Sequence, residues 1–359
     1  MSEYGNPLKF NFHNLVMVQV FTQSQMVSEF FRGEYGYHLV DEIDEELPAV
    51  KLHFEYRPGW IACPDGFKRH LHKGLAHWVY RVDISNEVIQ IEVKGNRWAI
   101  PMVHHMLVHQ SLRYLACQRG ILMLHAGAVA NSGYSLVFTG HGGAGKTTTT
   151  SLILASGGTE WSIHADDYVF LAPDSTTLAY ITRSHLYKDL LRWVPDVGSR
   201  LTPPERLRLE GYGRLRSWSG ERIKWPVRLP AERLWPDYQL NRQAKLAGLV
   251  ILQQDWIDAP QLIRLQPGDV PVMELIEMNF SEARHYRNLL AKNHPKQDVE
   301  RLFDDWQASE LNLLTQRIEE TQVYLLKRPI DSSGTLDSRL SFVRQVADLI
   351  PHAEVDNEQ

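Results

Sequence analysis

The feature that most constrains this chain is a glycine-rich stretch, GHGGAGKTTTT, at residues 140–150. It follows the apolar segment YSLVF at 134–138 and leads into the helix-like stretch SLILAS at 151–156. A buried strand that turns through glycines into a helix is typical of nucleotide-binding α/β proteins. The stretch therefore predicts an α/β fold with a phosphate site at the turn.

The same residues satisfy two motifs that bind different cofactors. Gly140, Gly142 and Gly145 form G-x-G-x-x-G, the dinucleotide motif, and Gly140 also begins G-x-x-x-x-G-K-T, which ends at Lys146 and Thr147. In a triphosphate loop the backbone amides surround phosphate oxygens, the lysine reaches the β and γ phosphates, and the hydroxyl binds Mg²⁺. The dinucleotide motif leaves the Lys-Thr pair unexplained, so the sequence favours ATP and Mg²⁺ over a nicotinamide dinucleotide. The residues expected to bind the nucleotide are Gly140, His141, Gly142, Gly143, Ala144, Gly145, Lys146, Thr147 and Thr148.

Two adjacent carboxylates, Asp166 and Asp167, follow the apolar residues Ile163 and Ala165. In phosphoryl transfer one carboxylate can hold the metal, directly or through water, while a second accepts the proton of the attacking hydroxyl. Adjacent residues of a strand point to opposite sides, so a bend must bring both carboxylates to one site. The alternatives are a turn or cap built from two aspartates, and the acidic residue of a dinucleotide site.

The remaining sequence indicates two domains. Residues 1–100 alternate between strand-like segments and polar connectors, and predict a small α+β domain. Pro101 opens a helical stretch that Gly120 ends, and residues 101–359 form the larger domain with a helical C-terminal part. The expected strands of the first domain lie at 10–20, 50–56, 78–82 and 88–93, the last two as a hairpin.

Composition excludes several partners. A formal net charge of -5 argues against nucleic acid, because binding to phosphates needs a basic surface. Apolar runs are too short to span a bilayer, so no membrane partner is expected. Two cysteines are too few for a disulfide scaffold, and with no signal-peptide pattern at the N-terminus the expected compartment is the cytoplasm.

Residues 124–171, LHAGAVANSGYSLVFTGHGGAGKTTTTSLILASGGTEWSIHADDYVFL, resemble the catalytic domain of HPr kinase/phosphorylase. That family combines a histidine on the first strand of a hairpin, a loop ending in GK[ST], and Ala-Asp-Asp after the next strand. The resemblance implies a P-loop kinase domain of the type shared with ATP-dependent phosphoenolpyruvate carboxykinase. It is nearest to the HPr-kinase-related families, such as type B, and implies assembly into homo-oligomers.

The resemblance also implies roles for individual residues. His125 takes the place of the family histidine near the transferred phosphoryl group. Lys146 and Thr147 bind triphosphate and metal, and Asp166 and Asp167 supply the base and a metal contact, with Asp167 assigned beside Thr147 as metal ligand.

A basic segment, GERIKWPVRLP at 220–230, is similar to the family's later basic loop. Arg222, Lys224 and Arg228 are therefore candidates for contacts to phosphate or acceptor, and a solvated basic surface is the alternative. The family signature Glu-x-Arg-Gly-x-Gly is not present, so phosphorylase activity and the HPr substrate are not carried over.

These features predict an ATP- and Mg²⁺-dependent kinase that transfers the γ-phosphoryl group to a hydroxyl. By resemblance the first expected acceptor is a serine of a protein or peptide. A small-molecule kinase for a metabolite or sugar is one alternative, and an ATPase or nucleotide switch without an acceptor is another.

Overall fold

The chain folds into a mixed α/β structure of two compact units. The first unit contains residues 1–123 and 272–314, and the second contains residues 124–271 and 315–359. The computed structural model describes residues 6–42, 44–72, 74–85, 87–156, 160–220, 222, 225–235, 242–329, 343, 345, 346 and 348–350.

A mixed seven-stranded sheet forms the centre of the first unit, in the order β3-β1-β2-β4-β7-β6-β5. β2, β4 and β7 run parallel to one another, and the other neighbours are antiparallel. The expected hairpin is confirmed as β6 and β7. The strands are β1 (Leu8–Phe12), β2 (Val16–Phe21), β3 (Leu39–Val40), β4 (Ala49–Tyr56), β5 (Lys68–His72), β6 (Ala76–Ile84) and β7 (Val88–Gly95).

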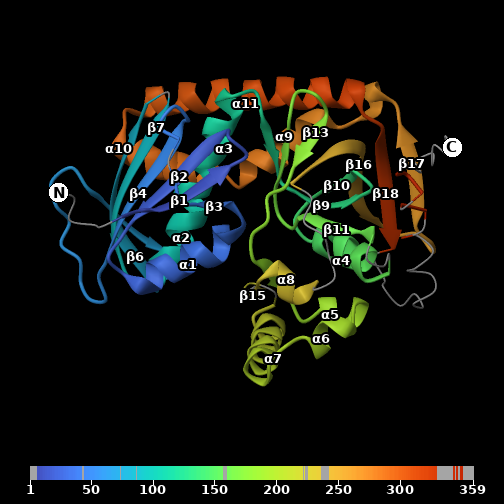
Figure 1. The fold of residues 1–359 in the computed structure, drawn as a ribbon, viewed down its shortest axis with the longest axis horizontal. Coiled ribbons are helices and arrows are strands. Elements are labelled where there is room, and N and C mark those ends of the chain that lie inside the picture. Colours follow the sequence, from blue (N-terminus) through green and yellow to red (C-terminus); the bar gives the residue numbers. More distant parts are fainter. Residues whose placement is uncertain are drawn as a thin grey trace. The chain divides into compact units, whose positions relative to one another are not determined.

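Helices cover the first sheet, and α3 contacts β2 and β4 (Figure 1). The expected helix after residue 100 is confirmed: helical structure runs unbroken through α2, the π-helical turn η2 and α3, and the chain turns at Gly120, whose φ is 73°. The helices are α1 (Gln25–Tyr35), η1 (Gly36–His38), α2 (Ala99–Val103), η2 (His104–Val108), α3 (His109–Gln118), α9 (Val272–Ser281), α10 (Arg284–Asn293) and α11 (Lys296–Glu320), which continues into the second unit.

The division into units differs from the boundary that we predicted at residue 100. Helix α3 packs on the first sheet, and its Arg113 forms a fully buried ion pair with Glu310 of α11. The first unit therefore keeps residues 101–123 and takes back 272–314. No local pattern marks this return, because the contacts join segments almost 200 residues apart.

The second unit is built on another mixed sheet, in which strands follow the order β11-β9-β10-β16-β13-β12 and β18 pairs with β16 and β17. β10, β16 and β18 are parallel. The strands are β9 (Ala126–Asn131), β10 (Tyr134–Thr139), β11 (Ser162–Ala165), β12 (Val169–Leu171), β13 (Thr176–Leu178), β16 (Gln243–Asp255), β17 (Gln261–Leu265) and β18 (Val323–Pro329). β8 (Leu122–Leu124) marks the passage from one unit to the other, and β14 (Ser184–Leu186) with β15 (Val227–Leu229) forms a separate two-stranded sheet.

Helix α4 packs on β9, β10 and β11 of this sheet (Figure 1). The expected turn between β9 and β10 is confirmed, since Ser132 and Gly133 both have positive φ, 50° and 80°, as a tight hairpin turn requires. The helices of the second unit are α4 (Lys146–Ser156), α5 (Leu190–Trp193), α6 (Asp196–Ser199), α7 (Pro203–Trp218), α8 (Ala231–Leu234) and η4 (Pro267–Asp269). Across the described part of the chain, no helix has the length and apolar character needed to cross a bilayer.

Candidate active site

The glycine loop joins the end of β10 to the start of α4 at the carboxyl ends of three parallel strands. Gly140, Gly143 and Gly145 have φ of 150°, 89° and 99°, in a region that side chains disfavour. A Cβ on Gly140 would lie 2.6 Å from the carbonyl oxygen of Leu252 on β16. The glycines therefore allow both the fold of the loop and its close approach to the sheet.

Lys146 is the first residue of α4, and it is 8% exposed. Its Nζ donates a hydrogen bond of 2.8 Å to the carbonyl oxygen of Gly140, so the side chain folds back over the loop. The loop amides, the helix N-terminus and this ammonium group together favour an anion at this position. His141, Gly142 and Gly143 are exposed there, Ala144 is buried, and Gly145, Thr147 and Thr148 are half-buried.

Asp166 lies beside the glycine loop. The chain bends at Asp166 and Asp167 directly after β11, as the proximity of both carboxylates to one site requires. Asp166 is 5% exposed, and its carboxylate accepts hydrogen bonds from the backbone N of His185, at 3.0 Å, and from the side chain of Thr147. Thus Asp166, rather than Asp167, is the neighbour of the loop threonine.

Asp167 lies between two imidazole rings. Its Oδ2 is 3.2 Å from Nδ1 of His185, and its Oδ1 is 3.8 Å from Nε2 of His125. His125 in turn stacks on Tyr168, with ring centroids 5.0 Å apart. The Asp167 side chain is 39% exposed, so it is the carboxylate that an incoming molecule can reach.

The two carboxylates have opposite electrostatic environments. Burial, and then the charge of Asp167, raise the pKa of Asp166 to about 6. Burial would also raise the pKa of Asp167, but hydrogen bonds from His125 and His185 outweigh it and hold that pKa well below its usual range. For His185, burial disfavours the charged ring, yet the hydrogen bond to Asp167 raises its pKa.

The structure brings one of the three basic candidates to the site. Arg228 on β15 lies directly across from His185 on β14, and its charge acts on that imidazole. Arg222 is exposed, four residues beyond the end of α7 at Trp218, and no contact joins it to the aspartate pair in the described structure. Lys224 lies outside the described residues.

Sequence reasoning missed two residues of the site, His185 and Arg328. The guanidinium of Arg328, at the end of β18, is 3.4 Å from the carbonyl oxygen of Ala144 and from Oγ1 of Thr149. The only signal for Arg328 was a basic residue at the end of an apolar strand, where parallel strands place ligand-binding groups. His185 carried no local motif.

Three histidines lie on η2 and the start of α3, at positions 104, 105 and 109. His104 and His109 are buried, and their ring centroids are 6.4 Å apart, whereas His105 is 3.5 Å from Glu282. No cluster of three or more histidine, cysteine or acidic side chains suited to a metal occurs within the described ranges. A magnesium site that uses one or two carboxylates and the phosphates of a nucleotide would not form such a cluster.

Comparison of the sequence with models of known protein families gave no match. A search of curated protein sequences gave none either. We therefore infer the function from the geometry of this site.

Proposed function

We propose that the second unit is an ATP- and Mg²⁺-dependent phosphotransferase that transfers the γ-phosphoryl group to a hydroxyl, with a P-loop kinase domain of the HPr-kinase-like type. The observation that carries the proposal is the contact between the glycine loop and the aspartate pair. Thr147 of the loop hydrogen-bonds to Asp166, and Asp167 follows at once with two imidazoles beside it. The loop that would bind the nucleotide and the carboxylate that would accept the proton therefore lie next to each other.

The glycine loop fits the triphosphate. Backbone amides at the start of α4 would donate to phosphate oxygens, as at other helix N-termini. The ammonium of Lys146 already crosses the loop, and it can exchange its bond to Gly140 for a phosphate oxygen. Arg328 adds a second cation beside the loop carbonyls.

Thr147 and Asp166 fit a magnesium ion. Both offer oxygen donors, which Mg²⁺ prefers, and they already contact each other. The raised pKa of Asp166 shows that negative charge is unfavourable in this buried position, and a bound cation would relieve that cost. When bound, the ion would neutralise charge on the β and γ phosphates. We therefore assign Asp166, and not Asp167, to the metal.

Asp167 is the proposed proton acceptor for the attacking hydroxyl. It is the more exposed carboxylate, and reach matters before pKa in choosing a base. His185 and His125 hold its orientation, and Arg228 across from His185 would counter charge on the phosphoryl group. By resemblance the first acceptor is a protein or peptide serine, and the second is a metabolite or sugar hydroxyl.

The test follows γ-labelled ATP with Mg²⁺ into a whole cell extract. We expect label in an organic acceptor with the unchanged protein and none with Asp167→Asn, although that variant should still bind a fluorescent ATP analogue. Lys146→Ala should lose analogue affinity by about 10- to 100-fold, the value of one charge-assisted hydrogen bond. Asp258→Asn, at an exposed aspartate of the same unit, is the control. Label found only as inorganic phosphate would contradict the transferase proposal and favour an ATPase or switch.

A further inference from the structure

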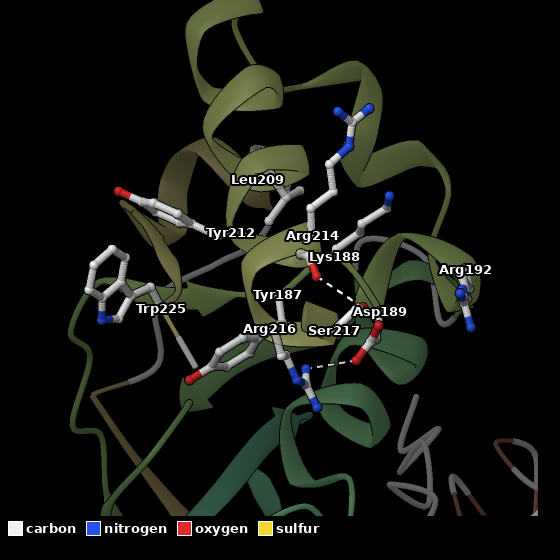
Figure 2. A pocket seen from close by; sticks show the side chains of 11 residues that line it. Tyr187, Lys188, Asp189, Arg192, Leu209, Tyr212, Arg214, Arg216, Ser217 and Trp225 are labelled. Carbon is white, nitrogen blue, oxygen red and sulfur yellow. Dashed lines mark hydrogen bonds and ion pairs between the residues drawn. The ribbon is translucent and has the colours of Figure 1, made fainter. Parts of the chain in front are cut away.

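A cavity lies in the second unit, lined by the segment that follows β14. It has a volume of about 290 Å³ and opens between the segment at 187–192 and one face of α7, with Trp225 at its edge (Figure 2). This volume is near the lower end of the range of small-molecule pockets, roughly 300 Å³ and above. We refer to it as the α7 pocket.

One side of the α7 pocket is aromatic. Tyr212 and Trp225 meet edge to face, with centroids 5.6 Å apart, and Figure 2 shows the two rings together on the same side. Tyr187 adds a third ring, over which the guanidinium of Arg216 lies 5.8 Å from the centroid. Trp225 is 43% exposed, so part of its ring is accessible to a ligand. Rings of this kind bind flat or ring-shaped molecules by stacking.

The lining is also strongly basic. Lys188 is held by Glu210 at 2.5 Å, and Arg216 is held by Asp189 at 2.7 Å. Four cationic side chains and one carboxylate, Asp189, are in the lining; the cations are Lys188, Arg192, Arg214 and Arg216. Such an excess attracts an anionic ligand and fits a carboxylate or phosphate group.

The α7 pocket is electrostatically linked to the proposed active site. Tyr187 directly follows β14, whose His185 contacts Asp167. Burial first, and then the charges of Asp167 and Asp166, raise the pKa of the Tyr187 phenol. A molecule held against Tyr187 would therefore lie two residues along the chain from His185, the residue that contacts Asp167.

We propose that the α7 pocket binds the phosphoryl acceptor, and that the acceptor is a small anionic alcohol: a ring-shaped molecule with a hydroxyl and a carboxylate or phosphate group. The inference rests on the proposed function. It favours a small molecule over a protein serine, since a stable protein partner would cover about 800 Å² of surface, whereas a pocket of about 290 Å³ is of a size for a small molecule.

The first experiment uses the full chain, Mg²⁺, γ-labelled ATP and a cell extract filtered to remove macromolecules. We expect a labelled organic phosphate in the filtrate that binds an anion exchanger more tightly than a neutral sugar monophosphate does. Pretreatment of the filtrate with immobilised phosphatase separates the two anion sources: a phosphate-bearing acceptor is destroyed, and a carboxylate-bearing one survives. Label confined to the protein fraction of the whole extract would overturn the inference while leaving the kinase proposal intact, and label only as inorganic phosphate would contradict the kinase proposal itself.

The second experiment locates the labelled acceptor with variants. Arg214→Gln and Trp225→Leu should each raise the KM for that acceptor about tenfold, the loss of one charged or stacked contact, with an unchanged KM for ATP. Arg208→Gln is the matched control, because Arg208 is exposed on the same helix and outside the pocket lining. Equal KM values in the Arg214 and Arg208 variants would overturn the assignment of the α7 pocket.

Discussion

Single residues decide the chemistry of the aspartate pair. Asp166 and Asp167 are neighbours in sequence, but one contacts Thr147 and a backbone amide while the other contacts two imidazoles. Identical side chains therefore have opposite pKa shifts, and such separation is how adjacent carboxylates acquire different roles. The position of His185 is central, because its backbone holds Asp166 and its ring holds Asp167.

His185 gives the first residue prediction. We expect His185→Ala to slow phosphoryl transfer by about 10- to 100-fold, as loss of a supporting hydrogen bond often does, while the affinity for a fluorescent ATP analogue stays unchanged. His185→Asn keeps an N–H donor near Asp167 and should recover part of the rate. Single-turnover transfer with saturating ATP measures both variants. Equal rates for the alanine and asparagine variants would remove the positioning role.

The glycine loop gives a second, internally controlled prediction. Gly145 has φ of 99°, and an added Cβ would meet the guanidinium of Arg328, whereas Gly142 has open space around it and lacks a positive φ. Gly145→Ala should therefore weaken ATP binding by about tenfold, from roughly 1 to 2 kcal/mol of backbone strain. Gly142→Ala should bind normally. The double variant Gly145→Ala/Arg328→Ala separates the causes when it is compared with Arg328→Ala alone: equal ATP affinity of these two proteins would mean that side-chain crowding, and not φ, is responsible.

The candidate site could be predicted from sequence only where it is local. The loop and the aspartate pair each lie within one short segment of the sequence. The folded sheet brings them together, because β10 and β11 each pair antiparallel with β9 and so end at the same edge. His185 reaches the pair through a backbone hydrogen bond 19 residues away in sequence, and Arg328 reaches Thr149 across 179 residues. No motif fixes the number of residues between the partners of either contact, so the sequence alone could not predict these contacts.

Helix α7 lines the α7 pocket, and contacts at its first turn attach it to another helix of the second unit, α8. Its first turn carries a capping box, in which Glu205 accepts hydrogen bonds from the backbone and side chain of Thr202. Glu205 also binds Arg233 at the end of α8, at 2.7 and 2.6 Å. One carboxylate thus caps α7 and ties it to α8.

This arrangement predicts a pH-dependent contribution to stability. The hydrogen bond from Arg233, more than any other contact, lowers the pKa of Glu205 to about 2. Because the folded pKa is below the usual value of 4.5, the stabilisation is complete above pH 4.5 and is lost as pH falls towards 2. Glu205→Gln should lower the free energy of unfolding by about 1 to 2 kcal/mol at pH 7, and by less at pH 3.5. Urea unfolding at both pH values, with exposed Glu232→Gln as control, measures this; a loss independent of pH would contradict it.

The helices and strands themselves were largely predictable, because a hairpin turn or a glycine that ends a helix can be recognised from a few neighbouring residues. Two differences have physical causes. The strand expected at 10–20 is two strands, β1 and β2, since His13 and Asn14 take positive φ of 57° and turn the chain back. Helix α1 was not recognised, because its polar residues conceal a narrow buried stripe at Val27, Phe31 and Tyr35.

At the scale of the whole molecule, each unit is made of two separate chain segments. Residues 1–123 and 272–314 form the first unit, and residues 124–271 and 315–359 form the second. A buried network holds the second segment of the first unit: Arg113 donates to both oxygens of Glu310 and to the carbonyl oxygen of Asn279. Trp306 also donates to Glu310, at 2.9 Å. The network joins the two chain segments of the first unit and has no member among the residues of the proposed active site.

Because the Arg113–Glu310 network shares no residue with the proposed active site, we expect a change in the network to alter stability but not nucleotide binding. Arg113→Met leaves the fully buried Glu310 charge unpaired, and it should lower the free energy of unfolding by about 3 to 5 kcal/mol. The double variant Arg113→Met/Glu310→Gln removes the charge but keeps an acceptor for Trp306, so it should be more stable than the single variant. Both proteins, kept at low temperature where they stay folded, should bind a fluorescent ATP analogue as tightly as the unchanged chain, because the proposed nucleotide site belongs to the second unit. A loss of affinity as large as that of Lys146→Ala would instead show that the nucleotide site depends on the first unit. Equal destabilisation of the single and double variants would show that the buried charge is not what makes Arg113 necessary.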